Sequence, residues 1–260
     1  MDFEYSGKCF RLTGASEDDH IVSVIRDSGS FYELDLLEYM QWVLKKREGG
    51  NLAKLVLDVG ANIGNHSVFI GTFIAEHVLA IEPNPESVAQ LQENLRNNLE
   101  NYTIHDCALG ESSGHGRVHM PENATNNLGM AKIVTEEGGP IRVRSLDELI
   151  IERNETQELI MPVSGMKIDV EGMELFVLKG AFNTLQNDHP ELFIEAATPS
   201  QLAEIEEFLD VFGYRKVATW AATPTHHFTT RKSNITRLNI FIYKLKRRVK
   251  YRLQRLVGRA

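Results

Sequence analysis

Short apolar runs, most of them ending on an acidic residue, recur along the chain and alternate with segments whose apolar residues are three or four positions apart. The short runs predict buried β-strands, and the longer segments predict amphipathic helices that cover them. This alternation predicts a doubly wound, mostly parallel α/β sheet with helices on both faces. The expected strands are residues 55–58, 78–81, 102–106, 166–170, 191–195, 214–219 and 239–243, the last two closing the sheet in the antiparallel sense.

The N-terminal part and one central segment have other patterns. Residues 1–30 predict short strands, the clearest over 20–26, and apolar residues on one face predict a helix over 36–47. Residues 109–145, rich in glycine, serine and asparagine, predict an inserted hairpin or meander near the mouth of the site. The expected organisation is one domain over 1–243, made of an N-terminal cap (1–50) and a core (51–243), followed by a helix over 244–260.

The segment from Asp58 to Gly64 joins the first strand of the core to a helix. Gly60 and Gly64 open a turn that lets the backbone approach a ligand and aims the free N–H groups of the helix at it. The second strand ends on Glu82, whose carboxylate would accept hydrogen bonds from both ribose hydroxyls of a nucleoside. Asn62 stands where the dinucleotide fingerprint requires a glycine, and no lysine follows Gly64 as in a P-loop. A nucleoside cofactor without phosphates fits better, and S-adenosylmethionine is the common one.

Acidic residues recur at the ends of the expected parallel strands. Ligands of doubly wound sheets bind beyond the C-terminal ends of the strands. This shared position therefore predicts a single active-site rim, formed by Asp58, Glu82, Asp106, Asp169 and Glu195.

The composition and the cysteine content indicate in which cellular compartment the protein functions. The 260 residues are 42% hydrophobic and 25% charged, which is ordinary for one large α/β domain with a substantial core. Cys9 and Cys107 form neither a disulfide framework nor a metal-binding spacing, and the first residues do not resemble a secretory signal. Apolar runs stay below the 18 residues that a membrane span needs. We therefore expect a cytoplasmic protein.

The charge is distributed unevenly. The net charge is −8, yet residues 244–260 contain eight basic residues and no acid. Apolar residues within this segment recur at helical spacing, which predicts a basic amphipathic helix. Such a helix would lie on an anionic membrane surface, at the cytoplasmic face, or dock on the acidic body or a second subunit, or remain disordered. An acidic body without a basic, aromatic-studded groove excludes nucleic acid. The oligomeric state stays open.

Several of these motifs together resemble the FkbM family of S-adenosylmethionine-dependent methyltransferases. The resemblance implies a Rossmann-like class I fold with a seven-stranded sheet. It also implies O-methylation of a sugar, glycan or natural product, often in polysaccharide biosynthesis. It does not identify the acceptor. The pieces that carry it are Phe31-Tyr32-Glu33, the turn at 57–67, Ile81-Glu82-Pro83, Lys167-Ile168-Asp169-Val170-Glu171-Gly172 with Glu174 and 178–181, and Gly213-Tyr214.

Roles follow for the residues of the cofactor half. Asp58 and the backbone at Gly60 and Gly64 should hold the methionine part of the cofactor, with help from Asn62. Glu82 should hold the ribose. The remaining acid of this half, Asp106, would accept a hydrogen bond from the adenine amino group.

The acceptor half must align a hydroxyl and remove its proton. Asp169 is expected to act as the general base, or as a ligand of a divalent cation such as Mg²⁺ together with Glu195. His66, next to the turn, is the alternative base, because a helix N-terminus depresses its pKa. Other acceptor contacts are expected from Tyr32 and Glu33 of the cap, from Glu171, which would also cap its helix, and from His227, placed with His226 in a late loop.

Three other functions compete with glycan O-methylation. A non-catalytic binding protein would keep the fold but lose the acids. A nicotinamide-dependent sugar oxidoreductase would need the dinucleotide fingerprint and a Tyr-x-x-x-Lys pair, neither of which is evident. Methylation of a small metabolite, or N-methylation of an amino sugar, also stays open.

Overall fold

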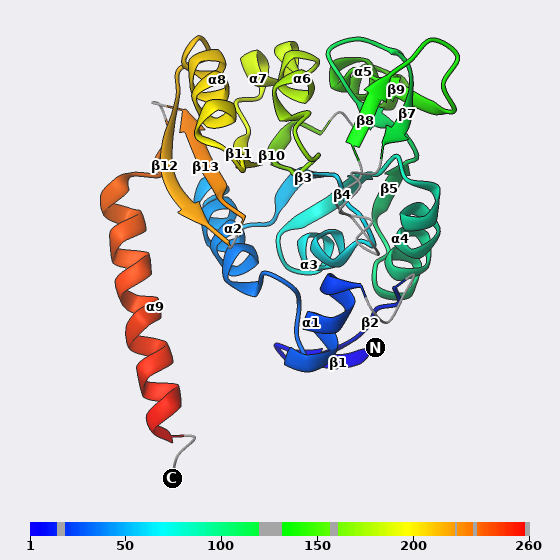
Figure 1. The fold of residues 1–260 in the computed structure, drawn as a ribbon. Helices are drawn as coiled ribbons and strands as arrows, with labels where there is room; N and C mark the ends of the chain where they lie inside the picture. The colour runs from blue at the N-terminus through cyan, green and yellow to red at the C-terminus, as the bar shows by residue number, and fades with distance from the viewer. Residues whose placement is uncertain (15–18, 120–131, 157–160, 222, 231–232, 258–260) are drawn as a thin grey trace.

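A seven-stranded sheet forms the centre of the molecule in a computed structural model, which describes residues 1–14, 19–119, 132–156, 161–221, 223–230 and 233–257 (Figure 1). The strand order is β12-β13-β11-β10-β3-β4-β5. Only β13 runs antiparallel to its neighbours in this sheet. The strands are β3 (Ala53–Val59), β4 (Ala75–Ile81), β5 (Tyr102–His105), β10 (Val163–Ile168), β11 (Glu191–Glu195), β12 (Tyr214–Trp220) and β13 (Thr225–Thr230). The mostly parallel seven-stranded sheet predicted for the core is confirmed.

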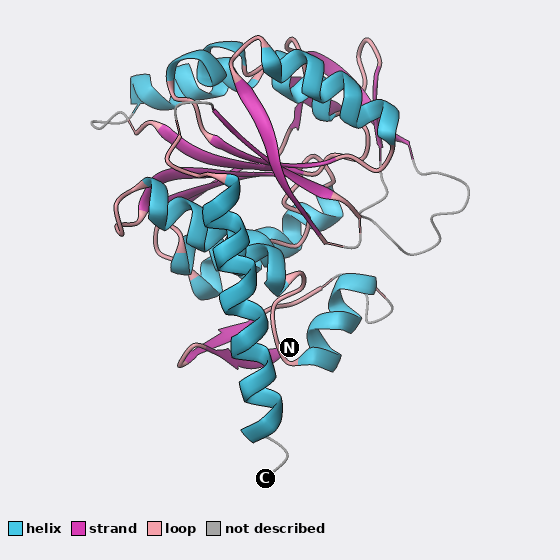
Figure 2. Ribbon diagram, turned by 90° about the vertical axis from the view of Figure 1, so that its left-hand side faces the viewer, coloured by secondary structure: helices cyan, strands magenta, loops and turns pink. Residues whose placement is uncertain are grey.

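Helices cover both faces of the sheet, which Figure 2 shows edge-on. Alternate residues of a strand point to opposite faces, so Leu55 and Leu57 join the core under one layer of helices, whereas Val56 joins the core under the other. Because both faces are buried, the strands read as nearly continuous apolar runs. One layer contains α2 (Leu34–Arg47), α3 (Asn65–Phe73) and α4 (Pro85–Asn98), and the other contains α5 (Leu146–Thr156), α6 (Glu174–Lys179), α7 (Phe182–Asn187) and α8 (Pro199–Asp210).

Two smaller sheets flank the core. β1 (Asp2–Tyr5) and β2 (Lys8–Arg11) form an antiparallel hairpin at the N-terminus. The insertion after β5 forms a sheet in the order β6-β9-β7-β8, made of β6 (Ala108–Leu109), β7 (Gly114–His119), β8 (Lys132–Thr135) and β9 (Ile141–Arg144). The asparagines expected in its turns, Asn123, Asn126 and Asn127, lie outside the described residues.

Two predicted strands are helices. Residues 20–26 lie in α1 (His20–Ser28), because the Asp19 carboxylate accepts the N–H groups of Ile21 and Val22 as an N-cap and Gly29 ends the helix in a left-handed conformation. Residues 239–243 lie in α9 (Arg237–Val257), where the Thr236 hydroxyl accepts the Asn239 N–H. β-Branched and aromatic residues suggested strands at both places, but the capping residues favour helices. The strand that closes the sheet is β13.

The order of connections sets the position of the site. The chain runs from β3 outward to β5 and returns to β10 on the other side of β3. The loops after β3 and β10 therefore diverge, and such a switch point is where doubly wound sheets bind ligands.

Candidate active site

A cavity of about 480 Å³ opens at the C-terminal ends of β3, β4, β10 and β11. His20 and Tyr32 of the N-terminal segment line it together with the strand ends, as expected of a cap. The carboxylates of Glu82, Asp169 and Glu195 all reach it. The predicted rim of acids is thus present in part, and the cavity is large enough for a nucleoside-sized ligand.

The turn after β3 is held by the neighbouring loops. The N–H groups of Gly60 and Ala61 both donate to the Ile81 carbonyl, at 2.9 and 3.0 Å. Gly60 has φ +78°, and a Cβ there would lie 1.8 Å from the Asp169 carbonyl oxygen. A Cβ on Gly64 would lie 2.7 Å from Leu91 of α4. Gly60 therefore gives room to the backbone of the β10 loop, and Gly64 gives room to a helix. Gly64 was predicted to hold cofactor and instead faces away from the cavity.

Glu82 has the geometry expected of a ribose-binding acid. Its two carboxylate oxygens accept the backbone N–H groups of Asn62, at 2.8 Å, and of Asn84, at 2.9 Å. These bonds fix the carboxylate and leave a second lone pair on each oxygen for a ligand. Burial raises its pKa to about 6, although the two N–H groups oppose the shift. Next to it, Asn62 lines the cavity, and its buried side-chain oxygen has no hydrogen-bond partner among the described residues.

Asp58 lies beneath the cavity floor. It is fully buried, accepts the Ser67 hydroxyl at 2.6 Å, and has the Lys167 ammonium at 3.8 Å. Because Asp58 is not among the described lining residues, the predicted direct contact with the cofactor is not what the structure shows. Asp58 instead secures the start of α3 and pairs with a buried cation.

Lys167 ties both halves of the site together. Its ammonium lies 3.0 Å from the Asp169 carboxylate and is almost fully buried. Burial would lower the pKa of Lys167, but Asp169, Asp58 and Glu33 raise it well above its usual value. Burial likewise opposes ionisation of Asp169, yet Lys167 lowers the pKa of Asp169. Burial and the neighbouring Asp169 carboxylate raise the pKa of Glu195. The two shifts have opposite directions, so Asp169 is the more acidic member of this carboxyl pair.

Two residues of the cap, Tyr32 and Glu33, and His66 of α3 also line the cavity. Glu33 has a left-handed backbone (φ +52°), unusual for this residue type, and its carboxylate lies 3.5 Å from the His66 Nε2 atom. The Tyr32 ring stacks on the His66 ring with 6.2 Å between centroids. Burial and Lys167 lower the pKa of His66 to about 3, so the imidazole is neutral. The structure thus brings Tyr32, Glu33 and His66 together at the cavity, with His66 less basic than a free imidazole.

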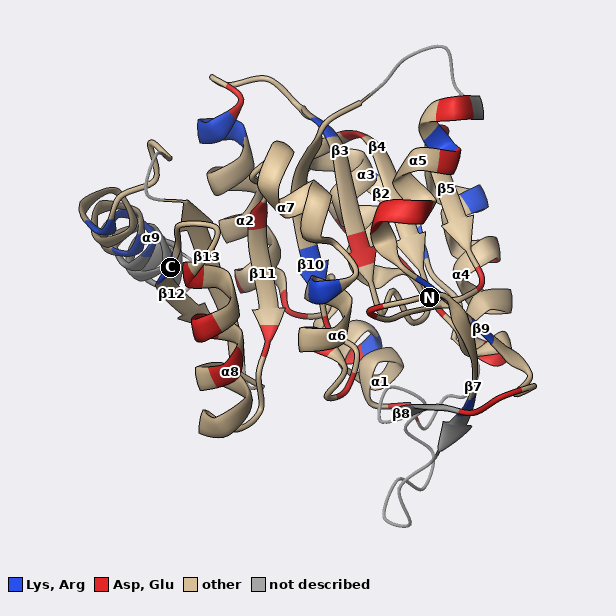
Figure 3. Cartoon of the chain, turned by 90° about the horizontal axis from the view of Figure 1, so that it is seen from above, with Lys and Arg blue, Asp and Glu red and all other residues tan. Residues whose placement is uncertain are grey.

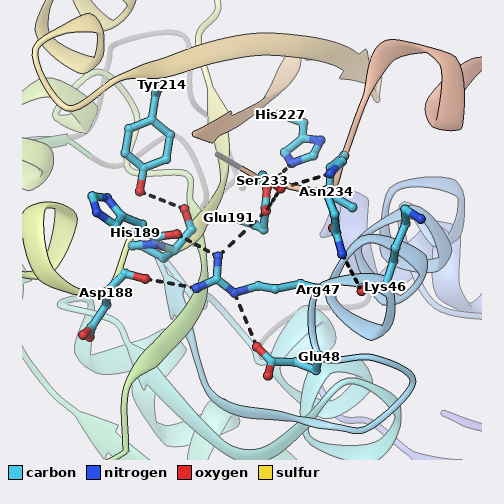
Figure 4. A network of polar contacts seen from close by, with 12 residues as sticks. Lys46, Arg47, Glu48, Asp188, His189, Glu191, Tyr214, His227, Ser233 and Asn234 are labelled. Carbon is cyan, nitrogen blue, oxygen red and sulfur yellow. Dashed lines mark hydrogen bonds and ion pairs between the residues drawn. The ribbon is translucent and has the colours of Figure 1, made fainter. Parts of the chain in front are cut away.

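His227 does not reach the cavity. It lies in β13 rather than in a loop and is fully buried. Its Nε2 atom pairs with Glu191 at 2.9 Å (Figure 4), and its Nδ1 atom pairs with Tyr39 at 2.7 Å. Ser233 also donates to Glu191, at 2.9 Å. The prediction that His227 contacts the acceptor is wrong, because its side chain joins a buried network at the opposite end of β11. His226, also buried in β13, bonds Thr219 at 2.9 Å.

Asp106 is likewise placed elsewhere. Its side chain is 71% exposed, and its carboxylate bonds Arg142 at 2.9 Å. Neighbouring Cys107 and Ala108 line the cavity, but Asp106 is not among the described lining residues. The position of Asp106 outside the described lining gives no support to the predicted adenine contact.

The acids proposed as metal ligands lie close together. Asp169, Glu171 and Glu195 each have a carboxylate oxygen within 4.8 Å of the others. The Lys167 ammonium already supplies a positive charge to Asp169. This donor set therefore fits a divalent cation poorly.

Sequence reasoning missed two parts of the cavity. The sequence analysis assigns no role to Lys167 beyond its place in a motif, although a lysine inside an apolar strand indicates a buried ion pair. Thr225 lines the cavity from the start of β13. The polar residues of this strand had suggested a loop.

Comparison with known proteins gives a consistent set of relatives. The pattern described as "Methyltransferase FkbM domain" matches residues 58–216. Hexuronic acid methyltransferase AglP of Haloferax volcanii is 37% identical over 130 residues, covering 50% of this chain and 51% of that protein. Methyltransferase sdnD of Sordaria araneosa is 27% identical over 219 residues, covering 69% and 82%. A crystal structure of methyltransferase FkbM from Methylobacillus flagellatus matches with TM-score 0.49 and 22% identity, over 74% of this chain and 50% of that one. The match thus spans about half the length of AglP and of that crystallised protein.

Proposed function

This chain belongs to the FkbM family of S-adenosylmethionine-dependent methyltransferases, and from that premise we propose that it transfers a methyl group from S-adenosylmethionine to a hydroxyl of a sugar, glycan or glycolipid-like acceptor. The observation that carries the proposal is the arrangement of Glu82 and Asp169 on one cavity. Glu82 offers two oriented acceptors at the end of β4, and an ionised Asp169 stands at the end of β10. S-adenosylmethionine supplies an activated methyl on a positively charged sulfur.

The cofactor half would be held by residues of the turn and of β4. Glu82 accepts the ribose hydroxyls, and the unpaired Asn62 oxygen accepts a further donor of the nucleoside or amino-acid part. Cys107, Ala108 and Leu109 offer a largely apolar wall for the adenine ring. Gly60 and Asp58 contribute by shaping and supporting the turn.

Cofactor binding provides the first test. We expect Glu82→Gln to weaken binding of S-adenosylmethionine about 10- to 100-fold, because a neutral amide replaces a charged acceptor of two hydrogen bonds. In the wild type, binding should weaken as the pH falls below about 6, where the carboxylate of Glu82 becomes protonated; in Glu82→Gln this dependence should be much flatter. Calorimetric titration with S-adenosylmethionine, beside NAD, measures both effects.

The matched control for that experiment is Glu86→Gln in the first turn of α4, outside the cavity. Its affinity should equal that of the wild type. Binding of NAD alone, or equal affinity in Glu82→Gln, would contradict the proposed cofactor.

The acceptor half favours a neutral hydroxyl. The described lining contains six carboxyl side chains and a single lysine, and that lysine is already paired with Asp169. A carboxylate acceptor would be repelled, whereas a sugar offers hydroxyls that donate to these acids. The similarity to a protein named as a hexuronic acid methyltransferase supports a sugar as the class of acceptor, whereas the acidic lining of this cavity favours a neutral sugar over a hexuronic acid. Tyr32, on the cap, offers a ring on which a sugar would stack.

Asp169 fits the role of general base better than His66. Its carboxylate is ionised, and its side chain is 32% exposed, compared with 8% for His66. A hydroxyl becomes strongly acidic once its oxygen begins to bond the methyl group, so a weak base suffices if it is correctly placed. Lys167 keeps Asp169 ionised, and His66 remains a neutral contact for the acceptor.

We expect the reaction to need no divalent cation. Because Lys167 already neutralises Asp169, incubation with EDTA followed by gel filtration should leave the formation of S-adenosylhomocysteine within about twofold of the untreated value. The same enzyme assayed with added Mg²⁺ is the control. A loss of activity that Mg²⁺ restores would establish Asp169, Glu171 and Glu195 as a metal site.

Assay of turnover separates catalysis from binding alone. Formation of S-adenosylhomocysteine would be followed with neutral methyl glycosides, amino sugars and hexuronic acids. Turnover with neutral sugars and not with hexuronic acids is expected. Binding of S-adenosylmethionine without turnover on any of these, or on a lipid-linked sugar, would favour a non-catalytic role.

The two cysteines are free thiols, which supports a cytoplasmic location.

A further inference from the structure

The C-terminal helix α9 presents an apolar stripe that faces away from the body. Its members, which we call the outer stripe, recur three or four positions apart, so they share one face of the helix. Each of them is between 40% and 66% exposed. The outer stripe consists of Leu238, Phe241, Ile242, Leu245 and Val249.

The opposite side of α9 attaches the helix to the body. Ile240 is buried, and the Tyr243 ring lies 4.7 Å from that of Trp42 on α2. Arg247 forms ion pairs with Asp35 and Glu38. These contacts fix the helix so that the outer stripe points outward, the reverse of an ordinary surface helix, which buries its apolar face against the body.

The charge of α9 indicates what covers the outer stripe. Residues 237–257 include eight Lys or Arg and no acid, and Figure 3 colours the basic residues in the described part of the helix. The protein as a whole carries −8. An apolar stripe flanked by positive charge is complementary to the surface of a bilayer that contains anionic phospholipids.

A second copy of α9 fits this surface less well. Two such helices packed through their outer stripes would bring eight cations against eight cations with no acid on either helix to pair with them. Among the described residues, no helix is long and apolar enough to cross a membrane. The geometry therefore favours a helix lying along a membrane surface, and α9, with 21 residues, is about 31 Å long.

We propose that the outer stripe of α9 inserts between the headgroups of an anionic phospholipid bilayer and holds the protein there as a peripheral membrane protein. Figures 1 and 2 show the far end of α9 extending beyond the rest of the chain. Attachment would use apolar insertion by the outer stripe and attraction between the lysine and arginine side chains and lipid phosphates. The inference stands independently of the reaction that the cavity performs.

Sedimentation of the purified full chain with vesicles tests this proposal. Binding to vesicles with about one third phosphatidylglycerol should exceed binding to pure phosphatidylcholine at least tenfold, and added salt should weaken it. Phe241→Ser combined with Leu245→Ser should reduce partitioning about tenfold or more. Lys246→Glu should reduce it about tenfold, because it reverses one charge beside the stripe.

Matched controls distinguish the outer stripe from general stickiness. Val249→Ser is a further test variant, which removes an exposed valine of the outer stripe. Val211→Ser is its control, which removes an exposed valine at the end of α8. Lys45→Glu is the corresponding control for charge, on α2. Only the α9 variants should lose vesicle binding. All variants should keep the wild-type melting temperature and the wild-type affinity for S-adenosylmethionine.

Two outcomes would overturn the proposal. One is a wild-type protein that binds neither kind of vesicle, or binds both equally. The other is a dimer in sedimentation equilibrium that Val249→Ser dissociates and Val211→Ser does not, which would show that a second copy covers the outer stripe.

Discussion

Asp169→Asn should lower kcat about 100- to 1000-fold while changing the affinity for S-adenosylmethionine less than about threefold. Asparagine keeps the shape of the side chain but cannot accept the proton of the acceptor hydroxyl. The loss therefore falls on the chemical step rather than on cofactor binding, which depends on Glu82. Single-turnover rates and calorimetric affinities measured on the same preparations separate the two effects.

Asp106→Asn is the matched control for that substitution. Asp106 lies at the end of β5, is 71% exposed and bonds Arg142 rather than a cavity residue, so its variant should turn over like the wild type. If Asp169→Asn retained more than about a tenth of the wild-type kcat, His66 rather than Asp169 would be the general base. His66→Ala would then be the slower enzyme.

Lys167→Met should lower the free energy of unfolding by about 3–5 kcal/mol, the largest loss of stability that we expect from a change at the site. It leaves the carboxylates of Asp58 and Asp169 in the interior without their cation. The ammonium itself contributes stability below the unfolded pKa of lysine, and this contribution is lost only as the pH rises through the raised folded value. Between about pH 6 and 9 the wild type should therefore show no change from this group.

The variant should respond to acid in a particular direction. Burial already raises the pKa of Asp58, and without Lys167 it rises further, so lowering the pH should relieve part of the penalty in Lys167→Met. Adding Asp58→Asn should restore part of the stability at neutral pH. Lys54→Met is the control, since Lys54 pairs with Glu76 at the surface and is 49% exposed; its cost should stay below about 1 kcal/mol. Chemical denaturation measures all four proteins, and equal losses for both lysines would contradict the assigned role of Lys167.

The parts of the fold that the sequence predicts are those with one strong local signal. β3, β4, β10 and β11 are short apolar runs that end on acids, and their common direction in a parallel sheet places Glu82, Asp169 and Glu195 at one cavity. The strand predicted over residues 20–26 is wrong. The β-branched residues there favour a strand, but Asp19 caps a helix at this position. The sequence did not predict β13 as a strand, because its buried side chains are mostly polar. These side chains find their partners only in the folded structure, as His227 does with Tyr39 and Glu191.

Side-chain direction is the other kind of information that spacing does not contain. Asp58 and Gly64 belong to the motif that we propose binds cofactor, yet the first faces Ser67 and Lys167 beneath the turn and the second faces α4. Each position depends on the packing of an element distant in the chain. Lys167 was missed for the same reason, because its partners Asp58 and Asp169 converge only when β3 and β10 pair.

The contact between Gly60 and Asp169 has a consequence for redesign of the enzyme. A Cβ on Gly60 would meet the Asp169 carbonyl oxygen at 1.8 Å, so the turn after β3 and the loop that carries Asp169, the proposed base, are packed backbone against backbone. Neither loop has room to be rebuilt for a new acceptor without displacing the other. Changes of acceptor range will be tolerated instead at positions that line the cavity from separate elements, Tyr32 on the cap and Thr225 on β13.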